Sequence, residues 1–170
     1  MRKRGWNPVA AVCGHTQRTR GAGSGCTAII ALITLVALAA PASAAAALPF
    51  RGVADLTITE VVPLGDDSVQ LTASATGVAT YLGRYTRTET VVLTPSTGIL
   101  VGTVVFTAAN GDELHADVIG GFTSATTAEG TYSFTGGTGR FKAASGEATF
   151  SAVTTDGVNF AITFAGTLNR

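Results

Sequence analysis

Apolar and polar residues alternate with a period of two over most of the chain beyond residue 50, which is the pattern of strands with one buried face. The final segment shows this alternation most clearly, because one of its faces carries only apolar residues: Val158, Phe160, Ile162, Phe164 and Leu168. The region after residue 48 also contains 23 threonines and 16 glycines, and it has no long window with apolar residues spaced three and four apart. This composition favours strands and disfavours helices.

Turn signals divide this region into eight predicted strands. We place them at about 53–62, 67–78, 80–93, 99–109, 112–122, 128–136, 146–155 and 158–168. Asn110-Gly111 and Asp156-Gly157 supply the positive φ angles of two-residue hairpins, and the spacing is too short for helical crossovers. An antiparallel meander follows. Closure removes the two exposed edges of such a sheet, so the predicted fold is all-β, an eight-stranded antiparallel meander closed into a barrel, with a two-sheet sandwich as the alternative.

The first 44 residues have the layout of a secretory signal peptide. A basic segment precedes the uncharged run 27–40, and the small residues Ala42 and Ala44 follow Pro41. We expect cleavage after Ala44 and a secreted or periplasmic product, with an uncleaved membrane anchor as the rival. The expected organisation is a signal peptide at 1–44, a short N-terminal extension at 45–52 and the β-barrel domain at 53–170. Both cysteines lie in the leader, so this domain would have no disulfides.

Charge is divided between leader and domain although the formal net charge is +0. Residues 1–44 contain five basic and no acidic residues, whereas the remainder contains six basic and all 11 acidic residues. An acidic domain lacks the clustered Lys and Arg that nucleic acids require, so nucleic acid is excluded as a partner. No membrane partner is expected after cleavage of the signal.

A glycine-rich segment lies between the sixth and seventh predicted strands and reads Gly136-Gly137-Thr138-Gly139-Arg140-Phe141-Lys142-Ala143-Ala144-Ser145-Gly146. It resembles the GGTGxFxxAxG signature of the dirigent and allene oxide cyclase-like superfamily. The resemblance implies an eight-stranded barrel with the motif between two late strands, frequent trimers, and chemistry in the barrel cavity, away from the motif. It assigns no catalytic position in this chain.

The same segment has a physical interpretation as a structural loop. Gly136, Gly137 and Gly139 permit left-handed backbone angles and close chain approach, and Phe141 can plug the barrel floor. A phosphate cradle would need a helix after the loop, with a lysine and a hydroxyl in register. A strand is predicted there instead, so phosphate binding is disfavoured.

The third predicted strand carries the main candidates for ligand binding. Period two places Tyr85, Arg87 and Glu89 on one face. If that face pointed inward, the two charges would mark either an ion pair or a wet cavity. The alternative is a solvated face of alternating charges, and the sequence favours this alternative.

His115 is the last candidate, because it is the one histidine outside the leader and alternates with Glu113 and Asp117 on the fifth strand. Strand neighbours two apart project about 6–7 Å from one another, too far to hold one zinc ion unaided. No metal site is therefore expected. Ser133, Ser145 and Ser151 lie in no GxSxG elbow, which disfavours a hydrolase.

No motif for haem, flavin, nicotinamide or calcium occurs, so no cofactor is expected. The predicted function is a small-ligand-binding module whose partner is a small apolar or amphipathic molecule. One alternative is an isomerase, cyclase-like or dirigent-like enzyme acting in the cavity through Tyr85, Arg87, Glu89 or His115. The other is a structural, envelope-associated protein with a fully packed barrel. The volume and polarity of the interior distinguish these functions.

Overall fold

The computed structural model describes residues 47–170, which form a barrel of eight strands and one short 3-10 helix. The elements are β1 (Leu48–Gly65), β2 (Ser68–Ala79), β3 (Gly83–Thr94), β4 (Ile99–Ala108), β5 (Glu113–Ser124), β6 (Thr127–Gly137), η1 (Gly139–Phe141), β7 (Ser145–Thr154) and β8 (Asn159–Asn169). Both the leader expected at 1–44 and its cleavage point lie outside the described residues. Within the described part, no helix is long and apolar enough to cross a membrane.

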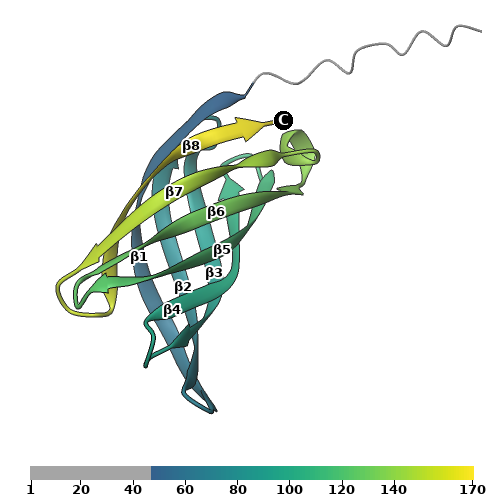
Figure 1. The fold of residues 1–170 in the computed structure, drawn as a ribbon. Helices are drawn as coiled ribbons and strands as arrows, with labels where there is room; N and C mark the ends of the chain where they lie inside the picture. Colours follow the sequence, from purple (N-terminus) through teal and green to yellow (C-terminus); the bar gives the residue numbers. More distant parts are fainter. Residues whose placement is uncertain (1–46) are drawn as a thin grey trace, which may run out of the picture. The chain divides into compact units, whose positions relative to one another are not determined.

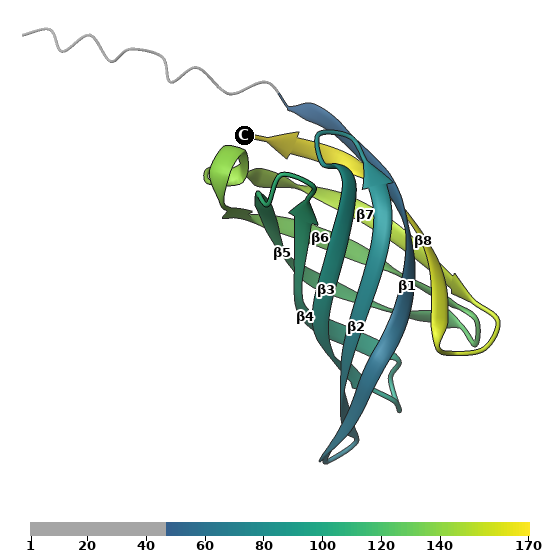
Figure 2. The same cartoon turned by 180° about the vertical axis from the view of Figure 1, so that it is seen from behind.

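Each strand pairs antiparallel with its neighbour in sequence, and β1 also pairs with β8, so the sheet has no free edge. Figures 1 and 2 show the closed ring of strands from opposite sides. The predicted antiparallel meander and its closure into a barrel are confirmed, and the two-sheet sandwich is wrong. Closure satisfies the backbone groups that an open sheet would expose at its edges.

Two predicted strand starts differ by three residues or more from those observed. β1 begins at Leu48 rather than at residue 53, because residues 48–52 pair with the end of β8. The barrel therefore includes most of the segment expected to be an extension. β3 begins at Gly83 rather than at residue 80, because Tyr81 and Gly83 have φ angles of 64° and 68° and form a turn.

The barrel has two different ends. The turns β1–β2, β3–β4, β5–β6 and β7–β8 lie at one end, which we call the open end. The connections β2–β3, β4–β5 and β6–β7, the start of β1 and the C-terminus lie at the other, which we call the closed end (Figure 1).

Aromatic side chains fill the interior near the closed end. Phe164 contacts four rings, with its centroid 5.3 Å from that of Phe50, 6.0 Å from Phe106, 6.1 Å from Tyr132 and 6.4 Å from Tyr85. Phe134 packs edge-on against Phe50 at 5.1 Å. Such pairs bury large apolar areas in fixed geometry, so this half of the barrel has a solid core.

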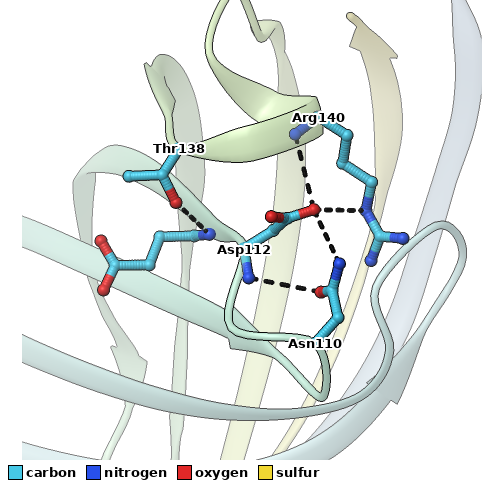
Figure 3. Close-up of polar contacts among 5 residues, drawn as sticks. Asn110, Asp112, Thr138 and Arg140 are labelled. Carbon is cyan, nitrogen blue, oxygen red and sulfur yellow. Dashed lines mark hydrogen bonds and ion pairs between the residues drawn. The ribbon is translucent and has the colours of Figure 1, made fainter.

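The glycine-rich segment lies at the closed end, between β6 and β7 (Figure 1), and is attached to the β4–β5 turn (Figure 3). The Asp112 carboxylate accepts hydrogen bonds from Asn110 Nδ2 at 2.8 Å and from the backbone N–H of Arg140 at 3.5 Å. Arg140 Nε lies 3.6 Å from the same carboxylate, and Thr138 Oγ1 accepts a bond from the Glu113 N–H at 2.9 Å. The segment therefore acts as a structural connection between neighbouring strands.

The conformation of this segment explains its glycines. Gly136 and Gly139 have φ angles of 117° and 52°, which side chains rarely adopt, and a Cβ at Gly139 would also collide with the Asp112 carboxylate. Gly137, at φ 159°, is close to extended, but a Cβ there would collide with the Glu113 carbonyl oxygen. Phe141 is fully buried in the core.

Candidate functional site

A cavity of about 330 Å³ occupies the open-end half of the interior. Its walls are mainly aliphatic and aromatic, and they include Leu56, Leu71, Val91, Phe122, Phe150 and Phe160. Exposed turn residues Ala125 and Gly157 lie at its rim, so the cavity communicates with solvent between the open-end turns. Its volume falls at the lower end of the range for small-molecule sites. The interior is thus packed with side chains in the closed-end half and contains a cavity in the open-end half.

Three polar side chains line the inner part of this cavity: Arg87, Glu89 and Tyr132. Arg87 and Glu89 project inward from β3, where period two keeps them on the face of Tyr85 and Val91. The Nη2 group of Arg87 donates to Glu89 Oε2 and forms an ion pair with it. Arg87 is 3% exposed, and the side chain of Glu89 is 12% exposed. The sequence-based interpretation of these charges as a solvated face is therefore wrong.

The guanidinium of Arg87 lies between two aromatic rings at the boundary of the packed half. Its Cζ is 5.4 Å from the ring centroid of Phe106 and 5.0 Å from that of Tyr132. Burial by itself lowers the pKa of Arg87, but Tyr132 and Glu89 outweigh it, so the pKa is raised above its ordinary value. Arg87 therefore remains charged even though it is buried.

Tyr132 is fully buried on β6 and stacks on Phe150 with centroids 4.7 Å apart. Burial raises the pKa of Tyr132 to about 12, although the nearby Arg87 opposes the shift. Its phenol therefore stays protonated at neutral pH. The sequence analysis missed Tyr132, yet the signal was present, since Tyr132 and the apolar Ala128 and Phe134 share one face in the period-two pattern of the sixth strand.

Tyr85 points inward but belongs to the packed half rather than to the cavity. Its hydroxyl donates to the Val53 carbonyl oxygen at 3.2 Å, and burial raises its pKa. The glycine at position 77 makes room for this contact, because a Cβ there would lie 2.7 Å from the Tyr85 hydroxyl. Tyr85 is thus separated from the cavity-lining pair with which the sequence grouped it.

The outer face beside Tyr85 has a larger hollow, an open depression of about 650 Å³ over β8, β1, β2, β3 and β4. Its charged lining residues are Asp55 and Arg84, which are both exposed. It lacks a buried polar group directed at a ligand, apart from the Tyr85 hydroxyl that Val53 already occupies. The interior cavity is therefore the better candidate site, despite its smaller volume.

His115 lies on the outer face of β5, and its side chain is 42% exposed. Its Nε2 is 2.9 Å from Glu113 Oε2. This position is outside the barrel wall, so the structure does not bring His115 together with Arg87 and Glu89. Of the four candidates named from the sequence, only Arg87 and Glu89 line the cavity.

Comparison with known proteins gives a likeness in fold. No protein-family model and no curated protein sequence matches the chain. Among solved structures, it is similar to a pterocarpan synthase dirigent protein with a TM-score of 0.52 and 14% sequence identity, covering 79% of this chain and 97% of that one. At this identity the likeness shows the fold alone. The barrel is therefore of the kind found in a dirigent protein, the fold that the glycine-rich segment led us to expect.

Proposed function

We propose that the barrel is a small-ligand-binding module that holds an apolar or amphipathic molecule in its open-end cavity. The observation that supports this proposal most directly is the contrast between the two halves of the interior. Phe50, Phe106 and Phe164 fill one half, whereas alanines face the other at Ala73, Ala128 and Ala152. A wholly structural barrel would gain stability by filling that space.

A fluorescence titration with 2-acetylnaphthalene tests this proposal. A gain of about 0.3 kcal/mol for each non-hydrogen atom, the figure typical of drug-sized ligands, would give a dissociation constant of about a millimolar, so the titration should extend to that concentration. Ala152→Phe and Ala128→Phe each place a ring in the cavity from neighbouring strands, because Ala128 pairs with Ala152 across β6 and β7. We expect both variants to abolish binding.

Val153→Phe is the matched control, because Val153 is the next residue of β7 and is 48% exposed on the outer face. It should bind 2-acetylnaphthalene as the unaltered chain does. Melting curves of all variants verify that each is folded. Binding that survives both cavity-filling substitutions, or no binding to the unaltered chain, would contradict the proposal.

Catalysis in the same cavity is the second candidate function. It is supported by the ion pair of Arg87 and Glu89 beside the protonated Tyr132, since buried charged groups in a cleft are typical of active sites. The likeness to a pterocarpan synthase dirigent protein agrees with it at the level of fold. If the unaltered chain converted a compound bound in the cavity, and Glu89→Gln abolished this reaction while still binding 2-acetylnaphthalene, the enzyme would be favoured over the binding module.

A further inference from the structure

The inner part of the cavity contains hydrogen-bond donors with no partner. Within residues 47–170, Arg87 Nε, Arg87 Nη1 and the Tyr132 hydroxyl have no hydrogen-bond partner and are shielded from solvent. The ring faces of Phe106 and Tyr132 compensate the guanidinium only in part. Unsatisfied buried donors are rare in native proteins because each keeps its desolvation penalty. Because Arg87 and Tyr132 belong to the cavity wall, a small shift of either side chain would bring these donors to an acceptor atom of a bound molecule.

The charge at this point is already neutralised. Glu89 pairs with Nη2 of Arg87, and it is the more accessible member of the pair, with 12% of its side chain exposed against 2% for Arg87. A ligand that enters the cavity therefore meets a neutral pair with spare donors rather than a free cation. A neutral acceptor oxygen suits this arrangement, whereas a carboxylate would face Glu89 at close range.

The entrance adds a second, independent charge effect. The exposed charged residues of the open-end half are all acidic: Glu60, Asp66, Asp67, Glu129 and Asp156. The exposed basic residues of the described barrel all lie in the closed-end half: Arg51, Arg84, Arg140, Lys142 and Arg170. Charges of one sign around an opening repel ions of the same sign and change their rate of entry. The open end therefore disfavours anions.

We propose that the cavity takes an uncharged molecule with an apolar body and one hydrogen-bond-accepting oxygen, as in a ketone, ester or ether, and that it discriminates against carboxylates. Arg87 and Tyr132 provide the donors that recognise the oxygen, Glu89 cancels the charge of Arg87, and the acidic open end repels anions. The inference rests on the proposed ligand-binding function and specifies the class of ligand for the same cavity.

Three naphthalenes with equal numbers of non-hydrogen atoms separate these effects. 2-Acetylnaphthalene carries a ketone, 2-isopropylnaphthalene has no polar atom, and 2-naphthoate carries a carboxylate. Equilibrium dialysis of the full chain against each compound gives three dissociation constants. We expect the ketone to bind about tenfold more tightly than the hydrocarbon, the gain of one good hydrogen bond, and the carboxylate to bind least tightly.

Two sets of variants assign the effects to residues. Arg87→Met, Glu89→Leu and Tyr132→Phe, made together, remove all the proposed donors and both charges at similar volume. This triple variant should abolish the preference for the ketone while the hydrocarbon still binds. A second variant removes three entrance charges by combining Glu60→Gln, Asp66→Asn and Glu129→Gln. Asp67 and Asp156 are kept because their carboxylates accept hydrogen bonds from neighbouring backbone N–H groups. This variant should strengthen 2-naphthoate binding by roughly twofold per charge at low salt, and the gain should disappear at high salt.

The outcomes distinguish the two proposals. If none of the three compounds binds, the proposed ligand-binding function fails. If they bind in a manner that Ala152→Phe blocks, but 2-naphthoate binds as tightly as the ketone, the function stands and the inference about ligand class is overturned. A ketone preference that survives the combined Arg87→Met, Glu89→Leu and Tyr132→Phe substitutions overturns it as well.

Discussion

Replacing Glu89 tests how the barrel tolerates charge in its interior. Glu89→Leu would leave Arg87 charged and buried without its anion, because a guanidinium keeps its proton at any ordinary pH. Loss of one partner of a buried ion pair costs about 3–5 kcal/mol. The partial exposure of Glu89 places the expected loss near the lower end, at about 3 kcal/mol.

Glu89→Gln should be milder, because its amide oxygen can still accept a hydrogen bond from Arg87, and one such bond contributes about 1 kcal/mol. Removal of both charges in Arg87→Met combined with Glu89→Leu should be close to neutral or stabilising, since neither desolvated ion remains. Thr88→Val is the matched control, because Thr88 lies between the pair on the exposed face of β3. It should change stability by less than about 0.5 kcal/mol.

Urea unfolding of these four variants, of Arg87→Met alone and of the unaltered chain gives the free energies of unfolding, and thermal melts supply an independent check. A loss of about 3 kcal/mol corresponds to a fall in melting temperature of roughly 10 °C for a domain of this size. The double-mutant cycle isolates the interaction between the two residues. If Glu89→Leu were no more destabilising than Thr88→Val, or if the double variant were as unstable as the single one, the pair would not be a buried, mutually dependent unit.

Three further predictions concern single residues. Gly139→Ala should destabilise the barrel by at least about 2 kcal/mol in urea unfolding, and its control Gly65→Ala by only about 1 kcal/mol. Both glycines have positive φ, but only at Gly139 would the added Cβ collide with a neighbour, the Asp112 carboxylate. Tyr132→Phe should be neutral or slightly stabilising in the same assay, since it removes a buried hydroxyl without a partner in the described part, and a clear loss would show that the hydroxyl is bonded. Asp156→Ala should lower the melting temperature at neutral pH. Hydrogen bonds from Asn159 and the Val158 N–H hold the pKa of Asp156 below its ordinary value, so its stabilisation is present above the unfolded pKa of about 3.9 and the deficit should shrink as the pH falls below it.

Much of the fold could be predicted from the sequence because its signals are local. The Asn110-Gly111 and Asp156-Gly157 turns lie where hairpins were predicted, and the alternation of Phe160, Ile162 and Phe164 places all three in the core. Errors arose where tertiary pairing decides the outcome. The start of β1 is a strand only because β8 lies beside it, and no local pattern in residues 48–52 indicates that partner.

The candidate site was harder to predict, because the same alternation describes an inward and an outward face. Period two correctly placed Tyr85, Arg87 and Glu89 on one face. Charges on a strand are usually solvated, so this face was interpreted as solvated, whereas the structure shows that it points inward. The sequence also did not show which half of the barrel interior each residue of the third strand would lie in. Tyr85 lies two residues before Arg87, yet it packs against Phe164 while Arg87 lines the cavity.

The position of Arg87 connects the two halves of the barrel. A single interior that was packed throughout would have no need of a charged residue at its centre, and a wet interior would have no need of Phe106 and Tyr132 around the guanidinium. Arg87 lies where the aromatic core ends and the cavity begins, with Glu89 on the side of the open end. Within residues 47–170, two nitrogens of this buried guanidinium have no hydrogen-bond partner, and each keeps its desolvation penalty. The polarity of the interior thus supports the same proposal as its volume, that the cavity holds a small molecule that enters from the acidic end.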